Sequence, residues 1–245
     1  MTLSSSEIRS RALLETNRQF YNGLWGDAQL VEAERFNTWP LVQSLLPLHP
    51  RRLEVAPGLR PRLPIAGTQF VDISSAALGK LAARGAQTTL APIYNLPFAD
   101  RSFDLLCSLD IIEHVEEDEQ AIAELARVAA PGAVLLISTP LHQSLWTEFD
   151  DFVGHRRRYE PQAITALLAR HGFVIQRSAV FGMTPRSSWL LDLGMWFLKH
   201  QRKRSMWWYN KVLPYTARRQ KPLQLQDGLL DTADVGEIFL VCRRK

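Results

Sequence analysis

The chain has 245 residues, of which 46% are hydrophobic and 22% are charged, and its formal net charge is +4. This composition excludes a disordered chain and predicts a globular protein with one α/β domain and an elaboration. The two cysteines, Cys107 and Cys242, lie in apolar runs, and neither they nor the six scattered histidines show metal-ligand spacing. We therefore expect buried free thiols, no metal site and a reducing, cytoplasmic location. The first residues also lack the basic-then-apolar order of a signal peptide.

Charge is distributed unevenly along the chain. Residues 193–226 contain no Asp or Glu but several aromatic residues and eight cations, namely Lys199, Arg202, Lys203, Arg204, Lys211, Arg218, Arg219 and Lys221. This mixture predicts peripheral contact of residues 189–221 with a membrane or with an acidic partner such as an acyl carrier protein. A solvated basic face is the alternative, with the aromatics packed on the sheet or on a dimer mate. No RNA-binding module is recognisable, so a nucleic-acid partner is not expected, and the oligomeric state stays open.

The hydrophobic periodicity changes after residue 49. Residues 7–25 and 27–46 have apolar residues at helical spacing and predict two helices in an N-terminal cap over 1–49. Seven strands are then expected, at residues 51–56, 68–73, 88–93, 103–109, 133–139, 172–181 and 236–244. Helices are expected between them, each ending at a glycine, over residues 74–85, 116–132 and 160–172.

Strands that alternate with helices predict an α/β fold with a doubly wound, mostly parallel, Rossmann-like sheet. We assign residues 50–181 to its core, with a lid over 140–161, and residues 236–245 to its final strand. The connection over 182–235 is too long for a turn and predicts a helical insert. The apolar stretch of this insert, 189–198, is too short to span a bilayer.

The turn after the first strand gives the first indication of function. In an open parallel sheet, ligands lie beyond the carboxyl ends of the strands, and an acid about twenty residues after the first turn holds a ribose. Glu54 and Gly58 form that turn, and Asp72 ends the next strand. The glycine positions of a dinucleotide loop hold Ala56, Gly58 and Arg60, which makes a poor phosphate cradle. The turn therefore favours S-adenosylmethionine, which has no phosphate, over a nicotinamide dinucleotide.

Three longer motifs follow in order, NLPFADRSFD (95–104), IIEHV (111–115) and ARVAAPGAVLLIS (126–138). With the first turn, they resemble the class I S-adenosylmethionine-dependent methyltransferases. The likeness is greatest to the small-molecule branch, methyltransferase type 11, which includes quinone-biosynthesis enzymes. It covers roughly residues 50–180 and implies a methyltransferase.

The resemblance also implies where the cofactor binds. The implied contacts are Glu54, Ala56 and Gly58 for the methionine end, Asp72 for the ribose, and Ile73, Asn95 and Leu96 for the adenine, with Asp110 and Ile111 after the fourth strand. The family's usual adenine-binding acid aligns with Pro92. Adenine is then expected to bind backbone groups or Tyr94, or else affinity for the cofactor is reduced.

The lid ends in GHRRRY (154–159), which is similar to the lid of related methyltransferases. His142 and His155 are the candidate bases for a hydroxyl acceptor, oriented by Asp150 or Asp151, of which we assign Asp151. The residues expected to contact the acceptor are Tyr21, Trp25, His114, Arg157 and Tyr159. Ion pairs that only fasten the lid, and simple packing of His114, are the structural alternatives.

Together these features predict transfer of a methyl group from S-adenosylmethionine to an oxygen, or to a carbon, of a small metabolite that is free or linked to a carrier or lipid. The alternative is a non-catalytic binding or scaffold protein, because Ala56, Arg60 and Pro92 depart from the family pattern.

Overall fold

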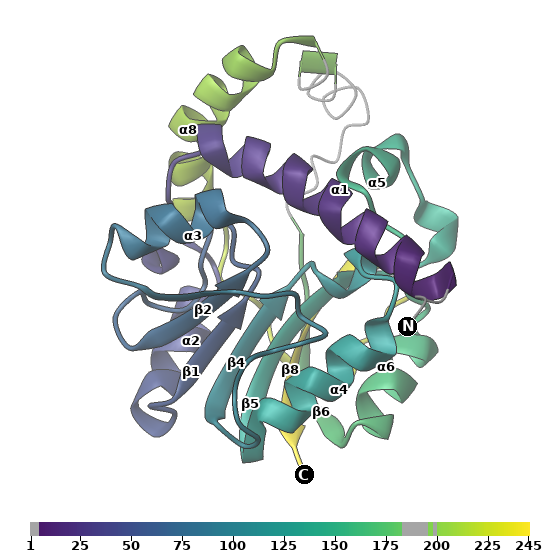
Figure 1. Cartoon of the computed structure of the whole chain (residues 1–245). Helices are drawn as coiled ribbons and strands as arrows, with labels where there is room; N and C mark the ends of the chain where they lie inside the picture. Colours follow the sequence, from purple (N-terminus) through teal and green to yellow (C-terminus); the bar gives the residue numbers. More distant parts are fainter. Residues whose placement is uncertain (1–4, 183–195, 198–199) are drawn as a thin grey trace.

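The computed structural model describes the backbone of residues 5–182, 196–197 and 200–245, with side chains from residue 14 onward except 202 and 203. At its centre is one eight-stranded sheet with the order β3-β2-β1-β4-β5-β8-β6-β7 (Figure 1). The strands are β1 (Arg52–Val55), β2 (Thr68–Asp72), β3 (Gln87–Leu90), β4 (Phe103–Leu109), β5 (Ala129–Pro140), β6 (Phe173–Val180), β7 (Gln226–Asp227) and β8 (Glu237–Arg244).

The pairing confirms the predicted fold class. Five strands are parallel. β1 pairs with β2 and β4, β2 also pairs with β3, and β4 also pairs with β5. β8 lies antiparallel between β5 and β6. All seven predicted strands are present, and the eighth, β7, is a two-residue strand on the edge of β6. The chain order reverses between β1 and β4, which is the switch point where doubly wound sheets bind ligands.

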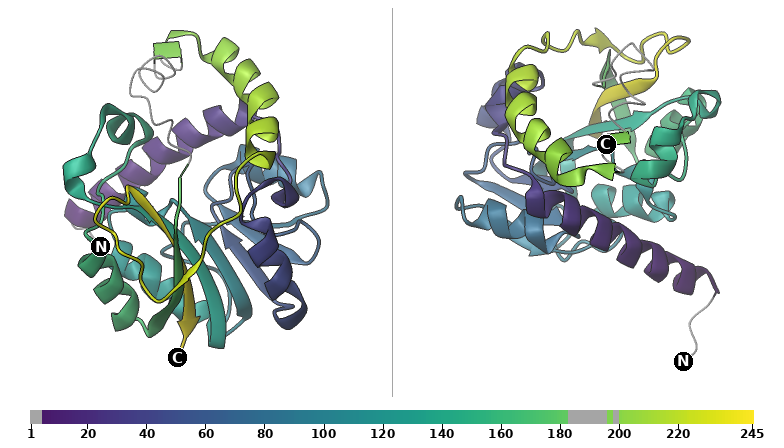
Figure 2. Two further views of the ribbon diagram at one scale, coloured as in Figure 1. Left: turned by 180° about the vertical axis from the view of Figure 1, so that it is seen from behind. Right: turned by 90° about the horizontal axis from the view of Figure 1, so that it is seen from above.

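Helices cover both faces of the sheet (Figure 2). α4 (Asp118–Val128) and α6 (Pro161–Arg170) lie on one face, and α2 (Trp39–Leu45) lies on the other, while α3 (Ser75–Ala82) packs on β2 and β3 near the edge of the sheet. On the first face Leu125 of α4 and Leu168 of α6 pack in one core with Leu106 of β4. On the second face Val42 of α2 packs in a core with Leu105 of β4. Burial from both sides explains why the central strands are almost continuously apolar.

The predicted helix over 27–46 is wrong in its first half. α1 (Ser5–Asp27) is followed by irregular chain and the short 3-10 helix η1 (Ala33–Arg35), and α2 starts only at Trp39. The N–H of Val31 donates to the carbonyl of Leu59 at 3.0 Å, so this segment lies along the loop after β1. Pro40 stands in the first turn of α2, where its missing N–H costs nothing. Contact with a distant loop thus overrides the local helical pattern.

Other boundaries differ by a few residues. The helix predicted over 116–132 ends at Val128, because the chain from Ala129 onward joins β5 and pairs with β4. The remaining short helices are η2 (Leu46–Leu48), η3 (Ile112–His114), η4 (Gln143–Leu145) and α5 (Glu148–Val153).

Three helices gather at the carboxyl edge of the parallel strands: α1, the lid helix α5 and α8 (Arg202–Arg218) (Figure 1). α8 belongs to the insert, for which we predicted helix over about 187–213. Residues 183–195 and 198–199 of that stretch lie outside the described residues. Within the described ranges, no helix has the length and hydropathy needed to cross a membrane.

Lys80 of α3 fastens the carboxyl end of α1. Its Nζ donates to the carbonyls of Trp25, Gly26 and Ala28 at 2.9, 2.7 and 2.7 Å. A cation at this end also balances the dipole of α1. We expect Lys80→Met to lower the free energy of unfolding by about 2 kcal/mol, because three carbonyls lose a charged donor. Urea denaturation measures this, and the exposed Lys221→Met should leave the midpoint unchanged.

Candidate active site

Asp72 organises the loop after β1. Its Oδ2 accepts the N–H of Gly58 at 3.0 Å, and its Oδ1 accepts the N–H of Ser74 at 2.8 Å. The side chain is buried, and burial raises the pKa of Asp72 from 3.8 to about 6 despite these donors. The acid predicted for the ribose therefore lies at the end of β2 and connects the loop to the start of α3.

Glu54 lies beneath the same loop. Its carboxylate accepts the N–H of Arg62 at 2.8 Å and the N–H of Leu63 at 2.8 Å. Burial raises the pKa of Glu54 from 4.5 to about 7. Both oxygens thus accept hydrogen bonds from the far end of the loop. Glu54, expected to contact the methionine end of the cofactor, instead holds the loop.

The loop backbone is strained at one position and tightly covered at another. Ala56 stands where the family has its first glycine and has a φ of 56°, in the left-handed region that favours glycine. Gly58 has a φ of 53°, and a Cβ built on it would lie 2.2 Å from Cζ2 of Trp25. Arg60 lies 5.4 Å from the centre of the Trp25 ring. Trp25, predicted for the acceptor pocket, therefore packs on the loop after β1.

The residues expected near adenine follow β2 and β3. Ile73 is half-buried and Asn95 is exposed. Leu96 is buried, and its N–H donates to Glu124 of α4 at 2.8 Å. The side chain of Asn95 is thus available to a ligand, while Leu96 is fixed by the core.

After β4, Asp110 forms a carboxyl pair with Glu237. Asp110 has a φ of 55° and accepts the Ser138 hydroxyl on Oδ1 at 2.6 Å. Burial, the charge of Asp110 and a hydrogen bond to it raise the pKa of Glu237 well above its usual range. Glu237 therefore keeps its proton and donates it to Asp110. Ile111 follows, half-buried, and its carbonyl accepts the N–H of His114 at 2.9 Å.

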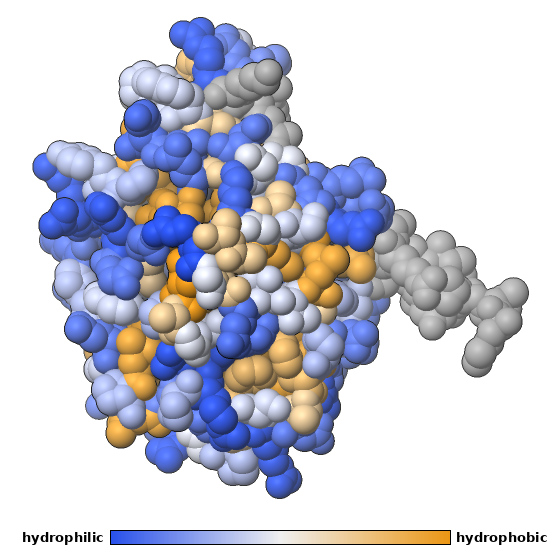
Figure 3. Space-filling model, turned by 60° about the vertical axis from the view of Figure 1, so that its left-hand side comes forward, coloured by the Kyte–Doolittle hydropathy of each residue, from blue (hydrophilic) through white to orange (hydrophobic). Residues whose placement is uncertain are grey.

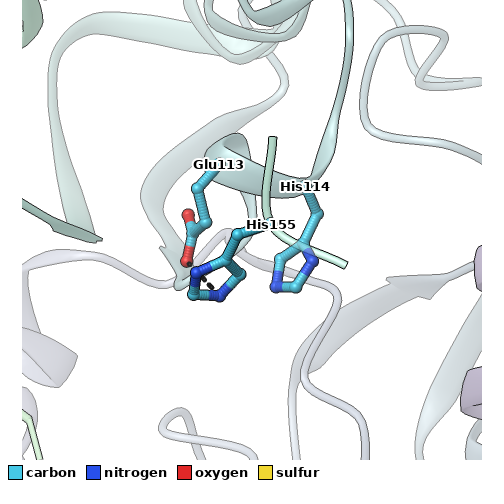
Figure 4. A group of neighbouring side chains, drawn as sticks. All are labelled: Glu113, His114 and His155. Atoms are coloured by element: carbon cyan, nitrogen blue, oxygen red, sulfur yellow. Dashed lines mark ion pairs between the residues drawn. The ribbon is translucent and has the colours of Figure 1, made fainter. Parts of the chain in front are cut away.

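Next to this pair is a cluster of Glu113, His114 and His155 (Figure 4). Glu113 is fully buried, and neither of its oxygens has a hydrogen-bond donor among the described residues. Its Oε1 lies 3.9 Å from Nε2 of His155, and the rings of His114 and His155 are 4.6 Å apart. Burial, followed by the charge of Asp110, raises the pKa of Glu113 well above its usual range. Tyr21 of α1 reaches the cluster, with its hydroxyl 3.4 Å from Nε2 of His114.

The cluster can act on a proton or on a metal ion. One atom from each of its three residues lies within 4.8 Å of the others. Two imidazoles and one carboxylate are a donor set suited to a divalent cation such as Zn²⁺. We predicted no metal site from the sequence, where Glu113 and His114 stand far from His155. The lid brings His155 to them in space.

Asp150 of the lid orients His155. Asp150 is fully buried; its Oδ1 lies 2.7 Å from Nδ1 of His155, and Arg158 donates to both oxygens at 2.9 and 3.0 Å. Burial alone would raise the pKa of Asp150, but these bonds and those from Thr147 outweigh it and hold the pKa below its usual range. An ionised Asp150 keeps the proton of neutral His155 on Nδ1 and leaves the Nε2 lone pair toward Glu113.

His142 and Asp151, the other predicted catalytic residues, are engaged elsewhere. Nε2 of His142 lies 2.7 Å from the carbonyl of Thr232, and its Nδ1 lies 3.5 Å from Glu160. Asp151 accepts the indole N–H of Trp146 at 3.1 Å. The carboxylate that orients a candidate base is therefore Asp150 rather than Asp151, and the base that it orients is His155 rather than His142.

Arg157 and Tyr159 fasten the lid. Arg157 pairs with Asp118 at 2.6 Å and donates to the carbonyls of Val115 and Glu116. Tyr159 is buried, and its hydroxyl donates to the same carboxylate at 2.6 Å. Both residues, predicted to contact the acceptor, hold the lid against the start of α4.

Sequence reasoning missed Glu237, Ser138 and Asp118. Glu237 is the first residue of β8, and an antiparallel strand brings its amino end to the edge where parallel strands end. An acid opening an otherwise apolar strand was the available signal. The local sequence does not show that β8 is antiparallel, and it is this direction that brings Glu237 to the site.

Residues 63–137 match a family model described as a methyltransferase domain. Norajmaline N-methyltransferase of Rauvolfia serpentina is 47% identical over 51 residues, which are 21% of this chain and 18% of that protein. The mitochondrial ubiquinone biosynthesis O-methyltransferase of Dictyostelium discoideum is 40% identical over 53 residues, 22% of this chain and 16% of that protein. The matched segments thus span less than a fifth of these relatives.

Among solved structures, the fold matches that of a Thermotoga maritima methyltransferase described as a possible histamine N-methyltransferase. The TM-score is 0.58 at 16% identity, over 87% of this chain and 91% of that one. Residues 63–137 thus carry a methyltransferase domain, and these findings support a class I S-adenosylmethionine-dependent methyltransferase. Similarity to the quinone-biosynthesis branch rests on short segments only.

The residues around the loop after β1 fit S-adenosylmethionine, the cofactor that such methyltransferases use. Each Asp72 oxygen accepts one backbone N–H and keeps a lone pair for one of the paired ribose hydroxyls. Pro57 offers no N–H to a phosphate, and this cofactor carries none. When bound, the cofactor supplies an electrophilic methyl group on a sulfonium. The ring of Trp25 covers the open side of Gly58 in this loop.

The buried histidine of the cluster makes stability depend on pH. Burial, followed by the charge of His155, lowers the pKa of His114 from 6.5 to about 3. Below its ordinary pKa the unfolded chain binds a proton that the folded chain refuses, so stability falls as pH falls. Between pH 7 and 5 the contribution of His114 drops by about 2 kcal/mol. The stability gap between wild type and His114→Gln, measured by urea unfolding, should shrink by that amount; a constant gap would contradict it.

Proposed function

We propose that this chain transfers the methyl group of S-adenosylmethionine to an oxygen of a small metabolite, free or linked to a carrier or lipid, with a carbon acceptor as the variant case. The observation that carries the proposal is the position of His155. Its neutral Nε2 faces the interior at the carboxyl edge of the sheet, and Asp150 holds its Nδ1.

The chemistry asked of the chain is modest. Methyl transfer is a displacement in which the protein aligns the acceptor, excludes water and removes a proton. His155 is the base for an acceptor hydroxyl, because burial lowers its pKa and keeps it unprotonated near neutral pH. Asp150 and Arg158 are positioning residues that fix its tautomer. The lid that carries His155 is fastened by Arg157 and Tyr159 and keeps water out.

A second candidate is transfer to the nitrogen of an amine. Three carboxyl groups, of Asp110, Glu113 and Glu237, influence one another in the same region, and Glu113 has no donor among the described residues. A protonated amine would supply the missing donor. The R. serpentina relative is named an N-methyltransferase, which keeps this candidate open.

Calorimetry with S-adenosylhomocysteine tests the cofactor step first. Binding would support the proposal, and no heat at millimolar ligand would leave the non-catalytic scaffold, which the strained Ala56 motivates. Methyl transfer from labelled cofactor to hydroxyl and amine compound pools then separates the two acceptor classes. We expect His155→Gln to abolish proton removal but not cofactor binding. The exposed pair of His171 with Glu119 lies away from the lid, so His171→Gln is the matched control.

A further inference from the structure

Helix α8 has two faces of opposite character. Its inner face consists of Met206, Leu213 and Ala217, which are buried. This face packs against the cap, because Met206 shares a cluster with Trp25, while Leu213 and Ala217 share another with Val31. Two hydrogen bonds of Asn210 fix the helix to residues 27–29. α8 is thus a firmly seated element.

The outer face of α8 carries large side chains that nothing in the described structure covers. Trp207, Trp208 and Tyr215 are 56%, 59% and 57% exposed, and Val212 is 43% exposed. The rings of Trp207 and Trp208 lie edge to face, 5.0 Å apart. A scattered apolar residue on a surface is ordinary, but three aromatic rings on one face of one helix indicate an interaction surface.

The charged side chains of this face are all basic. Arg204, Lys211, Arg218 and Arg219 are exposed, as is Lys221 just after the helix. Among the described residues, none of them forms a salt bridge, and Arg219 lies over the ring of Tyr215 at 4.2 Å. The chain has no acid between residues 193 and 226 that could neutralise them. In Figure 3 the upper part of the molecule, where α8 lies in Figure 1, is mostly blue and pale, as basic and aromatic residues are on this scale.

We propose that the outer face of α8, defined by Trp207, Trp208, Lys211, Tyr215, Arg218 and Arg219, docks on a membrane surface of anionic phospholipid. Tryptophan and tyrosine favour the depth of lipid head groups, and cations beside them meet the lipid phosphates. Binding of this kind is peripheral, through the side chains of one helix face. An acidic protein would explain the cations but not the exposed indole rings of Trp207 and Trp208. A lipid surface explains both, so we favour it.

Docking would also place the active site at the membrane. The inner face of α8 borders the cofactor loop, where Arg60 lies 6.0 Å from the centre of the Tyr209 ring. This consequence rests on the proposed function and points to an amphiphilic acceptor. The docking proposal itself does not depend on methyl transfer.

The experiment is co-sedimentation of the full chain, without cofactor or acceptor, with vesicles of phosphatidylcholine alone or of equal parts phosphatidylcholine and phosphatidylglycerol. We expect binding to the anionic vesicles, weaker binding at raised salt, and quenching of tryptophan fluorescence by brominated lipid. Replacing Lys211, Arg218 and Arg219 together by Gln should weaken binding by roughly 100-fold, at about five-fold per cation. The double variant Trp207→Ser, Trp208→Ser should lose binding and most of the quenching.

Matched controls keep the outcome readable. Leu48 is 75% exposed on η2, and Arg84 is exposed in the turn after α3, where it pairs with Glu32, so Leu48→Ser and Arg84→Gln should bind vesicles like wild type. The α8 substitutions are on exposed positions, and unchanged thermal unfolding would show that they fold. Equal binding by wild type and α8 variants, or no binding to anionic vesicles, overturns the proposal. Capture of an acidic carrier protein in place of vesicles would overturn it too. An inactive chain that still binds vesicles through α8 would refute the proposed function and leave the docking intact.

Discussion

Gly58→Ala should lower the free energy of unfolding by about 3 kcal/mol. The added Cβ would lie 2.2 Å from the Trp25 ring, at a residue whose φ is 53°. The overlap forces α1 away from the loop, and the left-handed backbone disfavours any side chain. Urea denaturation of both proteins measures the difference, with circular dichroism as the signal.

Gly85→Ala separates the two causes. Gly85 also has a positive φ, 85°, but nothing lies within 4 Å of its Cβ position. We expect a loss of about 1 kcal/mol there, from backbone strain alone. Trp25→Ala in the Gly58→Ala background should recover part of the loss, because it removes the overlapping ring. Equal losses at the two glycines would mean that Trp25 does not press on the loop.

Asp72→Asn should weaken S-adenosylhomocysteine binding by 10- to 100-fold, equivalent to roughly 1.5–3 kcal/mol for a hydrogen bond to a charged group. The ionised carboxylate holds the loop through Gly58 and is positioned for the ribose hydroxyls. Because burial raises its pKa to about 6, wild-type affinity should also fall as pH drops from 7 to 5. Calorimetry at the two pH values measures both effects.

The variant itself should bind with less pH dependence than wild type over this range, since an amide does not titrate and Glu54 is the titrating acid left beneath the loop. Asp104→Asn is the control: Asp104 pairs with Arg51 near the start of β4, at the opposite edge of the sheet. It should leave cofactor affinity unchanged. Unaltered affinity in Asp72→Asn would remove this carboxylate from the cofactor site.

The lid explains why several predicted site residues have structural partners. Asp150 holds the His155 ring, while Arg157 and Tyr159 both bind Asp118 at the start of α4. Together these contacts keep the His155 ring beside Glu113. Their value to the site is indirect, through the position of one imidazole. His142 and Asp151 lie in the same lid, yet their partners are Thr232, Glu160 and Trp146.

Local patterns were sufficient for much of the fold. Alternating apolar runs and helical periodicity located seven strands and the helices α3, α4 and α6, because burial from both faces leaves a mark on each strand. Asp72 and the turn at Gly58 were recognisable for a second reason. The carboxyl ends of parallel strands meet at one edge of the sheet, so an acid that ends a strand is expected near the ligand.

The sequence by itself determined the fold class, the family and the acid at the end of β2, since these depend on residues close together in the chain. Only the tertiary structure decided which lid carboxylate orients His155, that Glu237 faces Asp110, and that Trp25 lies on Gly58. Each of these contacts joins residues far apart in the chain, through a strand direction or a helix packing that local periodicity does not encode. The segment after α1 shows the same limit, because its backbone bonds to the loop of β1 and not to itself.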